Sequence, residues 1–505
     1  MNKSIWVESV INNKEEYSKL DESIETDIVI IGGGLTGLTS AYYLAKEGKD
    51  LIILEKNKIC NHTSGNTTAK ITSQHGLFYN YLINSIGEKQ AKQYLAANEK
   101  AIKNIKKIID EENIDCDFEE QDAYVFTQKE EDLNEIKKEV KAVNSIGFKS
   151  EFIEKIELPL DNVLGAIKFK GQAQFNPYKY STGLANSIEK YGGKIYEDSK
   201  VIDIKKSGEK YTVKTEGGEV VANKVILASH YPIITFPGYY FMKMYQETSY
   251  LIAVETSEEL FNGMYISSEE PTISFRTAIF NGKKVLLVGG MKHKTGAKID
   301  LKDAYNELEK VAKTIYPDAK VIYSWNTEDC ISLDKIPYIG EFSNLMPNVY
   351  VATGYKKWGM TTSNLAANII TDKILGKENQ YEEVFKSTRL KPIKNYEELG
   401  NMVKEVSYSL IFNKLKTENN TINSINPEDG KIVEIDKSKV GIYKDKNGNI
   451  YAVKPYCTHL GCELSWNNLD KTWDCPCHGS RFNYDGKSIY DPSIKDLETF
   501  NIENP

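Results

Sequence analysis

Cys457-Thr-His-Leu-Gly-Cys462 and Cys475-Pro-Cys-His-Gly-Ser480 lie close together near the end of a 505-residue chain that has only seven Cys and six His. Each stretch supplies a Cys and a His at short spacing, so the two could face each other as loops around one metal site. Such a set suits a [2Fe–2S] cluster that is bound by two thiolates and two imidazoles. A structural zinc ion is the alternative, because Cys₂His₂ sets are also common at zinc. Zinc would leave the further cysteine of each loop unexplained.

Both loops resemble the Rieske proteins of the cytochrome bc type at nearly every position. The resemblance implies a [2Fe–2S] cluster with four ligands and a disulfide between the loops: Cys457, His459, Cys475 and His478 as ligands, and Cys462–Cys477 as the bridge. In that family a serine and a tyrosine both donate hydrogen bonds to cluster sulfur. Here Ser480 is present, but Phe482 stands at the tyrosine position. We therefore expect a potential below the top of the Rieske range of about −150 to +300 mV.

A second motif lies near the start of the chain. Asp27-Ile-Val-Ile-Ile31 is a short apolar run that predicts a buried parallel strand, and it leads into Gly32-Gly-Gly-Leu-Thr-Gly37. A predicted helix over 38–46 and a second strand over 50–54 follow, and that strand ends at Glu55. This order of strand, glycine turn, helix, strand and acid is typical of dinucleotide binding. We expect the helix amino end to hold the pyrophosphate and Glu55 to accept hydrogen bonds from the ribose.

The following segment, His62 to His75, resembles the Ser/Gly-rich loop of the D-amino-acid oxidase and glycine oxidase family of FAD enzymes. The resemblance extends over roughly residues 25–380, and Leu333–Gly340 and Val349–Thr361 match later motifs in the family's order. It implies FAD, held by these residues: Gly32, Gly34, Leu35, Thr36, Gly37, Glu55, Lys56, Thr63, Ser64, Lys70, Val201, Ala228, Gly354, Trp358, Gly359, Met360 and Thr361.

The motifs predict two domains. Residues 1–390 are expected to form an α/β Rossmann-like FAD-binding domain with an inserted α+β substrate domain. The FAD-binding segments are about 24–80, 165–240 and 331–380, and the inserts are about 81–164, with an amphipathic helix over 88–112, and 241–330. A helical connector (Tyr396 to Lys414) and a polar linker are expected within 391–425, and a small all-β Rieske domain over 426–505.

Composition limits the partners. Hydrophobic residues make up 40% and charged residues 27%, which is ordinary for a globular enzyme. The formal net charge of −8 argues against a nucleic-acid surface. Met1 to Tyr17 lacks an apolar signal core, and the longest uncharged stretch, Ile28 to Ala45, is explained by the glycine motif without a transmembrane segment. We therefore expect a cytoplasmic protein.

The combination of a flavin and a Rieske cluster predicts a route for electrons. A flavin accepts two electrons as a hydride, whereas the cluster passes one at a time, so the expected order is substrate, FAD, [2Fe–2S] and an external one-electron acceptor. By resemblance, the substrate would be a small amine or amino acid that is oxidised at the carbon next to nitrogen.

Candidate substrate residues follow from the same resemblance. Arg276 lies close to where the family places an arginine that clamps a carboxylate, and Lys70 falls where some relatives have a basic residue near the flavin. Four aromatic residues could form a cage for a cationic amine: Tyr245, Tyr250, Trp325 and Trp358. Thr361 stands where oxygen-activating relatives carry a lysine, and Thr67 or Thr68 stands where relatives with histidyl-linked FAD carry a histidine. We therefore expect non-covalent FAD and poor oxygen reactivity.

Other functions fit the sequence less well. A Rieske oxygenase also needs a mononuclear iron held by two His and a carboxylate, and the remaining histidines lack ligand spacing. An NAD(P)H-driven reductase usually carries a second glycine motif, which is absent from the sequence. The main alternative is a flavin–Rieske electron-transfer protein or reductase that acts between redox partners without an amine substrate. In a further alternative the cluster is only structural.

Overall fold

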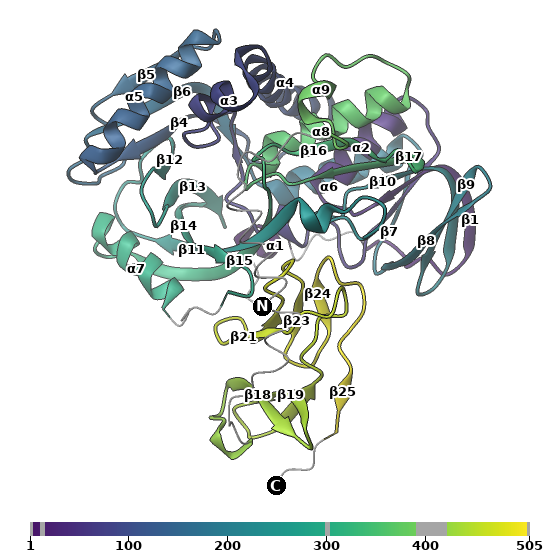
Figure 1. The fold of residues 1–505 in the computed structure, drawn as a ribbon. Coiled ribbons are helices and arrows are strands. Elements are labelled where there is room, and N and C mark those ends of the chain that lie inside the picture. Colours follow the sequence, from purple (N-terminus) through teal and green to yellow (C-terminus); the bar gives the residue numbers. More distant parts are fainter. Residues whose placement is uncertain (1–3, 11–15, 298–302, 390–421, 502–505) are drawn as a thin grey trace.

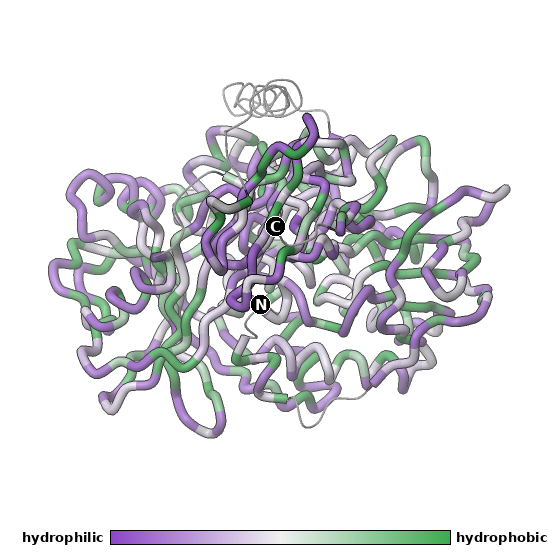
Figure 2. Tube along the Cα trace, turned by 90° about the horizontal axis from the view of Figure 1, so that it is seen from below, coloured by the Kyte–Doolittle hydropathy of each residue, from purple (hydrophilic) through white to green (hydrophobic). Residues whose placement is uncertain are grey.

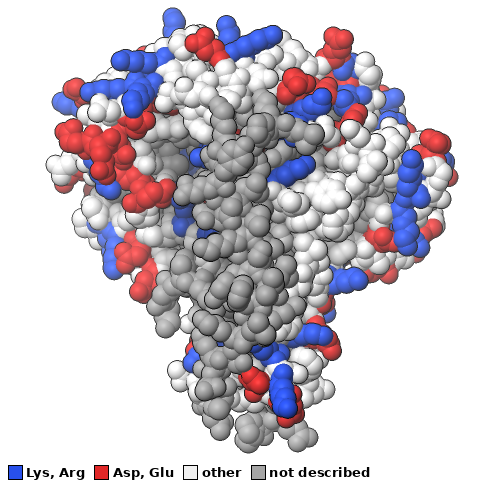
Figure 3. Space-filling model, viewed as in Figure 1, with Lys and Arg blue, Asp and Glu red and all other residues white. Residues whose placement is uncertain are grey.

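The computed structural model describes residues 4–10, 16–297, 303–389 and 422–501 (Figure 1). The expected connector helix, Tyr396 to Lys414, lies outside the described residues. Within the described ranges, no helix combines the length and the apolar character that crossing a membrane requires. On the face in Figure 3, positive and negative side chains are interspersed.

The first sheet carries the glycine motif. Its order is β16-β17-β10-β1-β2-β7, in which β16 pairs antiparallel and the other neighbours pair in parallel. The strands are β1 (Ser23–Ile31), β2 (Leu51–Leu54), β7 (Lys194–Tyr196), β10 (Glu219–Leu227), β16 (Tyr338–Ser343) and β17 (Met346–Thr353), and the hairpin of β8 (Val201–Ser207) and β9 (Lys210–Thr215) extends from β10. β1 ends in four buried residues, as a strand covered on both faces requires. Three helices are associated with this sheet: α2 (Leu35–Lys46), α6 (Pro177–Lys190) and α8 (Gly359–Ile374), of which α2 packs against both others.

The second sheet is mostly antiparallel and has the order β15-β11-β14-β13-β12-β4-β6-β3, with β5 paired to β6. Its strands are β3 (Lys70–Ile71), β4 (Glu119–Thr127), β5 (Ser150–Ile153), β6 (Gly165–Gln174), β11 (Met244–Glu255), β12 (Met264–Ser267), β13 (Ser274–Phe280), β14 (Lys283–Lys294) and β15 (Lys320–Ser332). Its lobe also holds α3 (Tyr79–Ile86), α4 (Glu88–Glu112), α5 (Glu130–Ser145) and α7 (Ala304–Ile315) (Figure 1). The predicted amphipathic helix over 88–112 is confirmed as α4.

The C-terminal part consists of two four-stranded antiparallel sheets, so the predicted all-β fold is confirmed. One sheet has the order β18 (Asp429–Ile435), β19 (Ser438–Lys444), β20 (Ile450–Val453) and β25 (Thr499–Phe500). The other has the order β21 (Ser465–Asn467), β22 (Thr472–Asp474), β23 (Arg481–Asn483) and β24 (Ser488–Tyr490). In the view from below, this part occupies the centre, between the two larger lobes (Figure 2).

Candidate active site and cluster site

The turn between β1 and α2 is built for close backbone contact. Gly32 has φ +110°, and a Cβ there would lie 2.6 Å from the carbonyl oxygen of Ala228. A Cβ on Gly37 would overlap the carbonyl oxygen of Gly32. Gly34 is the N-cap of α2 and offers no side-chain cap, and the N–H of Leu35 donates to the hydroxyl of Ser64 at 3.1 Å. The remaining N–H groups of the first helical turn can serve a ligand. An anionic pyrophosphate fits this helix end.

Glu55 follows β2 directly. Its carboxylate accepts from the N–H of Gly33 at 2.8 Å and from the N–H of Asn57 at 2.9 Å. Burial raises the pKa of Glu55, while these two hydrogen bonds favour its charged form. Glu55 therefore braces the glycine turn and also lines the cleft beside it.

A cleft of about 1340 Å³, its open mouth included, runs from the glycine turn to the start of α8. Most of the FAD residues predicted from the sequence line it: Gly32, Gly34, Leu35, Thr36, Glu55, Lys56, Thr63, Ser64, Val201, Ala228, Gly354, Gly359 and Met360. Gly37, Lys70, Trp358 and Thr361 do not. A cleft with a glycine turn, a helix amino end and a buried acid fits an extended dinucleotide such as FAD.

The C-terminal part also contributes to this cleft. Tyr490, Asp491 and Ile494 are among the lining residues, and the sequence had not suggested a role for them. Lys56, which was predicted to bind the cofactor, lies 3.2 Å from the carboxylate of Asp491 and donates to the carbonyl of Ile489 at 3.3 Å. No local pattern could have indicated these contacts, because they join residues more than 400 positions apart.

A second cavity adjoins the cleft, since Thr67, Asp329 and Lys357 line both. Of the four aromatic residues proposed for a cage, Tyr245, Tyr250 and Trp358 line this cavity. Trp325 does not, and its Nε1 donates to the carbonyl of Asn66 at 2.9 Å. The cavity is therefore an aromatic-lined space next to the FAD cleft.

Lysines distinguish the second cavity. Lys357 lies 3.2 Å from the carboxylate of Glu247, and Lys292 lies 2.6 Å from that of Glu270. Within the described part of the chain, Lys335 and Lys356 have no carboxylate within salt-bridge distance. These unpaired cations line the cavity, and sequence reasoning had missed them.

The Lys356 ammonium is packed against an apolar ring, because Nζ lies 3.8 Å from the centroid of Phe78. Burial lowers the pKa of Lys356 to about 7, and the nearby charges of Lys335 and Lys292 act in the same direction. Lys335, Lys356 and Lys357 all have positive φ. Three non-glycine residues in this conformation around one cavity are the kind of backbone strain that clusters at functional sites.

Of the two predicted catalytic residues, Lys70 lines the second cavity and Arg276 does not. The guanidinium of Arg276 donates to the carbonyls of Thr68, Ala69, Thr277 and Phe175, and the residue lines neither the cleft nor the second cavity. Lys70 lines the second cavity, but its ammonium nitrogen donates to the carbonyl of Tyr265 at 2.7 Å and to Ser274. Burial lowers the pKa of Lys70 well below its ordinary range.

His75 closes another side of the cavity. Its ring stacks on Trp358 at a centroid distance of 4.9 Å, and its Nδ1 lies 2.7 Å from the hydroxyl of Tyr94. Burial lowers the pKa of His75 to about 3, so the ring is neutral. Thr361 donates to the carbonyl of Thr72 at 3.1 Å and supports the same corner.

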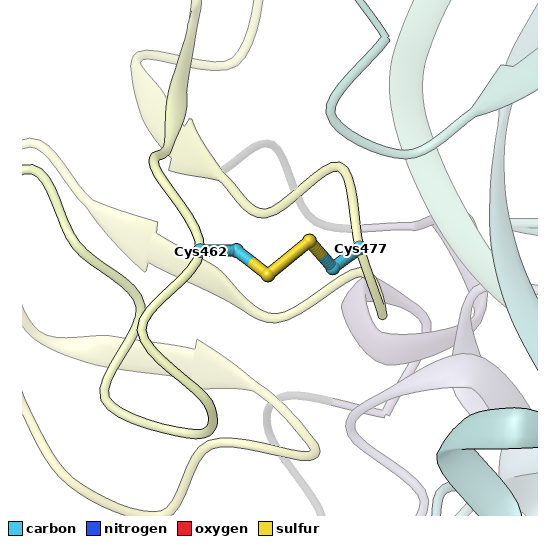
Figure 4. Close-up of a disulfide and its surroundings, with 2 residues drawn as sticks. All are labelled: Cys462 and Cys477. Atoms are coloured by element: carbon cyan, nitrogen blue, oxygen red, sulfur yellow. A yellow bond between two sulfur atoms is a disulfide. The ribbon is translucent and has the colours of Figure 1, made fainter. Parts of the chain in front are cut away.

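The two Cys/His loops meet in the C-terminal part. The predicted disulfide is present between Cys462 and Cys477, with the Cα atoms 6.5 Å apart, and joins the loops (Figure 4). Each loop is closed by backbone hydrogen bonds, from the N–H of Cys457 to the carbonyl of Cys462 and from the N–H of Cys475 to that of Ser480, both at 2.8 Å.

The four predicted ligands converge beside this disulfide. The His459 and His478 rings lie 5.1 Å apart at 87°, and the thiols of Cys457 and Cys475 contact each other. Nδ1 of each histidine is buried and has no hydrogen-bond partner. An unpaired buried nitrogen is costly unless a metal takes it, so the four side chains fit a [2Fe–2S] cluster with two imidazole and two thiolate ligands.

The side of the loops that carries His459 and His478 faces residues 235–246 of the FAD-binding part of the chain. His459 Nε2 lies 3.2 Å from the hydroxyl of Thr235, and the Phe241 ring centroid lies 5.6 Å from that of His478. Gln246 Nε2 donates to the carbonyl of His478 at 2.9 Å and to that of Asp491 at 2.7 Å. Because Asp491 also lines the cleft, these contacts link the cluster loop to the FAD site.

A buried ion pair reinforces this contact. Arg481, which is fully buried, lies 2.6 Å from the carboxylate of Glu328 on β15. Arg481 also pairs with Asp470 at 2.7 Å and Asp474 at 2.9 Å. Burial raises the pKa of Glu328 to about 7, although Arg481 favours the carboxylate.

Comparisons with known proteins agree with this geometry. The protein YhfW of Bacillus subtilis (strain 168), named for a Rieske 2Fe-2S centre, is 38% identical over 96% of both chains. Gamma-glutamylputrescine oxidoreductase of Escherichia coli (strain K12) is 24% identical over 74% of this chain and 88% of its own. The solved glycine oxidase from Geobacillus kaustophilus has a TM-score of 0.59 at 19% identity, covering 73% of this chain and all of its own.

Family models match both parts of the chain. The model of the DAO family, described as FAD dependent oxidoreductase, matches residues 27–373. The model of the Rieske [2Fe-2S] domain matches residues 420–501. The chain therefore belongs to the DAO family of FAD-dependent oxidoreductases and carries a C-terminal Rieske [2Fe–2S] domain.

Proposed function

We propose that this protein oxidises a small amine or amino acid at the C–N bond and passes the electrons through the Rieske cluster to an external one-electron acceptor. The observation that carries the proposal is a lysine- and aromatic-lined cavity that shares three residues with the FAD cleft. Bound FAD would take a hydride from the substrate carbon as C–NH becomes C=N with loss of a proton, and the cluster would forward two electrons singly. Hydrolysis of the imine by water would then give the carbonyl product and ammonia, or a smaller amine if the substrate nitrogen carries a second carbon.

The charges in the cavity favour a substrate with a carboxylate. Lys335 and Lys356 lack carboxylate partners among the described residues and line the space in which a substrate would lie. An acidic substrate group there would gain charge-assisted hydrogen bonds. In this proposal Lys356 takes the role first expected of Arg276. Arg276 instead fixes the backbone of Thr68 and Ala69, which adjoin the cavity.

The amine end would lie against the aromatic side. Tyr245, Tyr250 and Trp358 offer ring surface, and the neutral His75 holds Trp358 by stacking. The low pKa of Lys70 favours a neutral amine that can take a proton from a substrate ammonium. We keep Lys70 as a candidate base for that reason.

For electron transfer, the docked arrangement of the two domains supports an internal route. Asp491 lines the FAD cleft, and Gln246 hydrogen-bonds both to Asp491 and to His478. The names of two relatives, gamma-glutamylputrescine oxidoreductase and glycine oxidase, refer to nitrogen-containing compounds, which also supports an amine or amino-acid substrate. The domain bounds given above, 1–390 and 426–505, are part of the proposal.

An anaerobic screen tests the proposal. The holoenzyme is mixed with amines and amino acids while flavin absorbance is followed, and each positive mixture is frozen for EPR. We expect bleaching of the flavin followed by the signal of the reduced Rieske cluster. If no amine or amino acid bleaches the flavin, but a ferredoxin or NAD(P)H system reduces it rapidly, the protein is an electron-transfer protein or reductase between redox partners.

A further inference from the structure

We propose that the Rieske domain forms part of the FAD-binding site: the segment from Tyr490 to Ile494 closes one side of the cofactor cleft. FAD retention and docking of the cluster domain then depend on each other. The inference does not depend on which substrate is oxidised. It concerns a part of the chain that lies beyond the stretch matched by the DAO family model, residues 27–373.

The wall is made of side chains that are held in place. Tyr490 is 4% exposed, and its ring packs edge-on against His62 at a centroid distance of 5.4 Å. His62 lies in the loop just before Thr63 and Ser64, and all three line the cleft. Ile494 is half-buried and lines the same cleft. The segment thus faces the loop that the sequence assigns to the flavin.

An ion pair connects the 490–494 segment to the end of β2, on the other side of the cleft. Lys56 directly follows Glu55 at the end of β2, and its ammonium lies 3.2 Å from Asp491. Lys56 and Asp491 both line the cleft, so the pair spans the boundary between the two domains at the place where cofactor would lie. Side-chain exposures of 23% and 14% show that the pair is largely shielded from solvent.

The same segment is connected to the cluster loop. Gln246 donates to the carbonyl of Asp491 and to that of His478, which is a proposed cluster ligand. A ligand that contacts both sides of an interface stabilises that interface, and linkage makes the effect reciprocal. FAD should therefore hold the Rieske domain in its docked position, and the docked domain should slow the loss of FAD.

Two substitutions in the full-length holoenzyme test the wall. Ile494→Ala removes half-buried apolar surface, and Tyr490→Ala removes the ring against His62. Release of FAD on dilution is followed by flavin fluorescence, which gives the dissociation constant. We expect at least about a fivefold rise for each variant, equivalent to about 1 kcal/mol of binding free energy. Phe500→Ala is the matched control, because Phe500 is an exposed apolar residue of the same domain that does not line the cleft.

Two further measurements make the test decisive. The EPR signal of the reduced cluster reports whether each variant keeps a folded Rieske domain, and we expect it to be retained. Hydrogen exchange of the amides in 489–494 is compared between the holoenzyme and the FAD-depleted full chain, and we expect faster exchange without FAD. If Tyr490→Ala loses its cluster, the proposal is judged from the dissociation constant of Ile494→Ala and from the exchange experiment. A dissociation constant unchanged in Ile494→Ala, or exchange that does not respond to FAD, would overturn the proposal.

Discussion

A single hydroxyl separates this cluster site from the pattern that its loops otherwise follow. Ser480 is buried beside Cys457 and contacts its thiol, and its hydroxyl also accepts from the N–H of Ser493 at 3.0 Å. Phe482 is fully buried among the cluster loops and has no donor to offer. Hydrogen bonds to cluster sulfur raise the reduction potential. Because Phe482 offers no such donor, we expect the potential of this cluster to be lowered.

Phe482→Tyr should therefore raise the midpoint potential of the cluster. A hydrogen bond that favours the reduced form by about 1.4 kcal/mol corresponds to about 60 mV for a one-electron couple. A potentiometric titration followed by EPR measures the change, and Ser480→Ala should shift the potential in the opposite direction. An unchanged potential in Phe482→Tyr would show that the added hydroxyl does not reach sulfur.

Lys356→Met should weaken binding of carboxylates by about tenfold, or about 1.4 kcal/mol. Calorimetric titration with methoxyacetate, in which an ether oxygen replaces the amine, measures binding without turnover, and methoxyacetamide is the uncharged counterpart. Lys170→Met, which removes an exposed lysine paired with Glu151, is the control for lost charge. Equal affinity in Lys356→Met and the wild type would remove Lys356 from the substrate site.

The same binding should depend on pH. The pKa of Lys356 is about 7, so its ammonium is present below pH 7 and is lost as the pH rises through that value. Affinity for methoxyacetate should fall over that range in the wild type and stay flat in Lys356→Met. The neighbouring charges are Lys335, Lys292, Glu139 and Glu247, and His75 is neutral throughout because of its low pKa.

The predicted site residues that the structure brings together share one property: their chemistry lies in a local pattern. The glycines of 32–37 and the Cys/His loops of the cluster are short motifs, and each brings its members together through a turn. Lys356 and Tyr490 carry no such pattern, because their positions depend on packing between distant parts of the chain. For Lys356, the adjacent Lys-Lys pair in a glycine-containing loop was the available signal.

At the scale of elements, α2 and β1 depend on each other through the glycine turn. Gly37→Ala would place a Cβ onto the carbonyl of Gly32. The helix would have to move away from the strand, at a cost of about 1–3 kcal/mol or more. We expect loss of FAD and a lower unfolding temperature, measured by flavin fluorescence and calorimetry.

Gly48→Ala is the matched comparison. Gly48 has φ +72°, but a Cβ there meets nothing within 4 Å. This substitution should lower the folding stability by only about 1 kcal/mol, because alanine must adopt the left-handed conformation, and it should leave FAD bound. If the two variants lose FAD equally, close packing at Gly37 is not what the cofactor requires.

Strand register explains why Arg276 could not be placed from the sequence. It lies within β13, where neighbouring residues alternate between the two faces of the sheet. A shift of one residue would turn the guanidinium to the opposite face, and sequence patterns set strand bounds less precisely than that. The helix over 88–112 was easier to predict, since its apolar spacing continues over 25 residues.

For the whole molecule, the contact between the domains rests on a buried charge. Arg481→Leu would leave the carboxylates of Glu328, Asp470 and Asp474 buried without their cation. Removing one partner of a buried pair costs about 3–5 kcal/mol. We expect the Rieske domain to unfold at lower temperature, in a transition seen by calorimetry and by loss of the cluster absorbance.

Lys454→Leu provides the comparison in the same domain. Its partner Glu498 is exposed, and exposed pairs contribute only about 0–1 kcal/mol. The unfolding temperature of Lys454→Leu should therefore be close to that of the wild type. Similar behaviour of the two variants would mean that the Arg481 pair does not hold the domains together.

The docked geometry has a consequence for the proposed electron route, because it restricts where electrons could leave the protein. The edge of the histidine pair touches Thr235 and Phe241 of the protein's own larger domain. In the docked position His478 is buried, whereas His459 stays partly exposed, so the histidine edge is only partly open to a second partner. In the proposed reaction, each oxidised substrate yields two electrons and the cluster carries one, so the exit would be used twice per turnover. On that proposal, there are two ways out. The small domain could leave its docked position between the two transfers, so that domain motion would limit the rate of turnover, or the acceptor could take electrons through another side of the cluster.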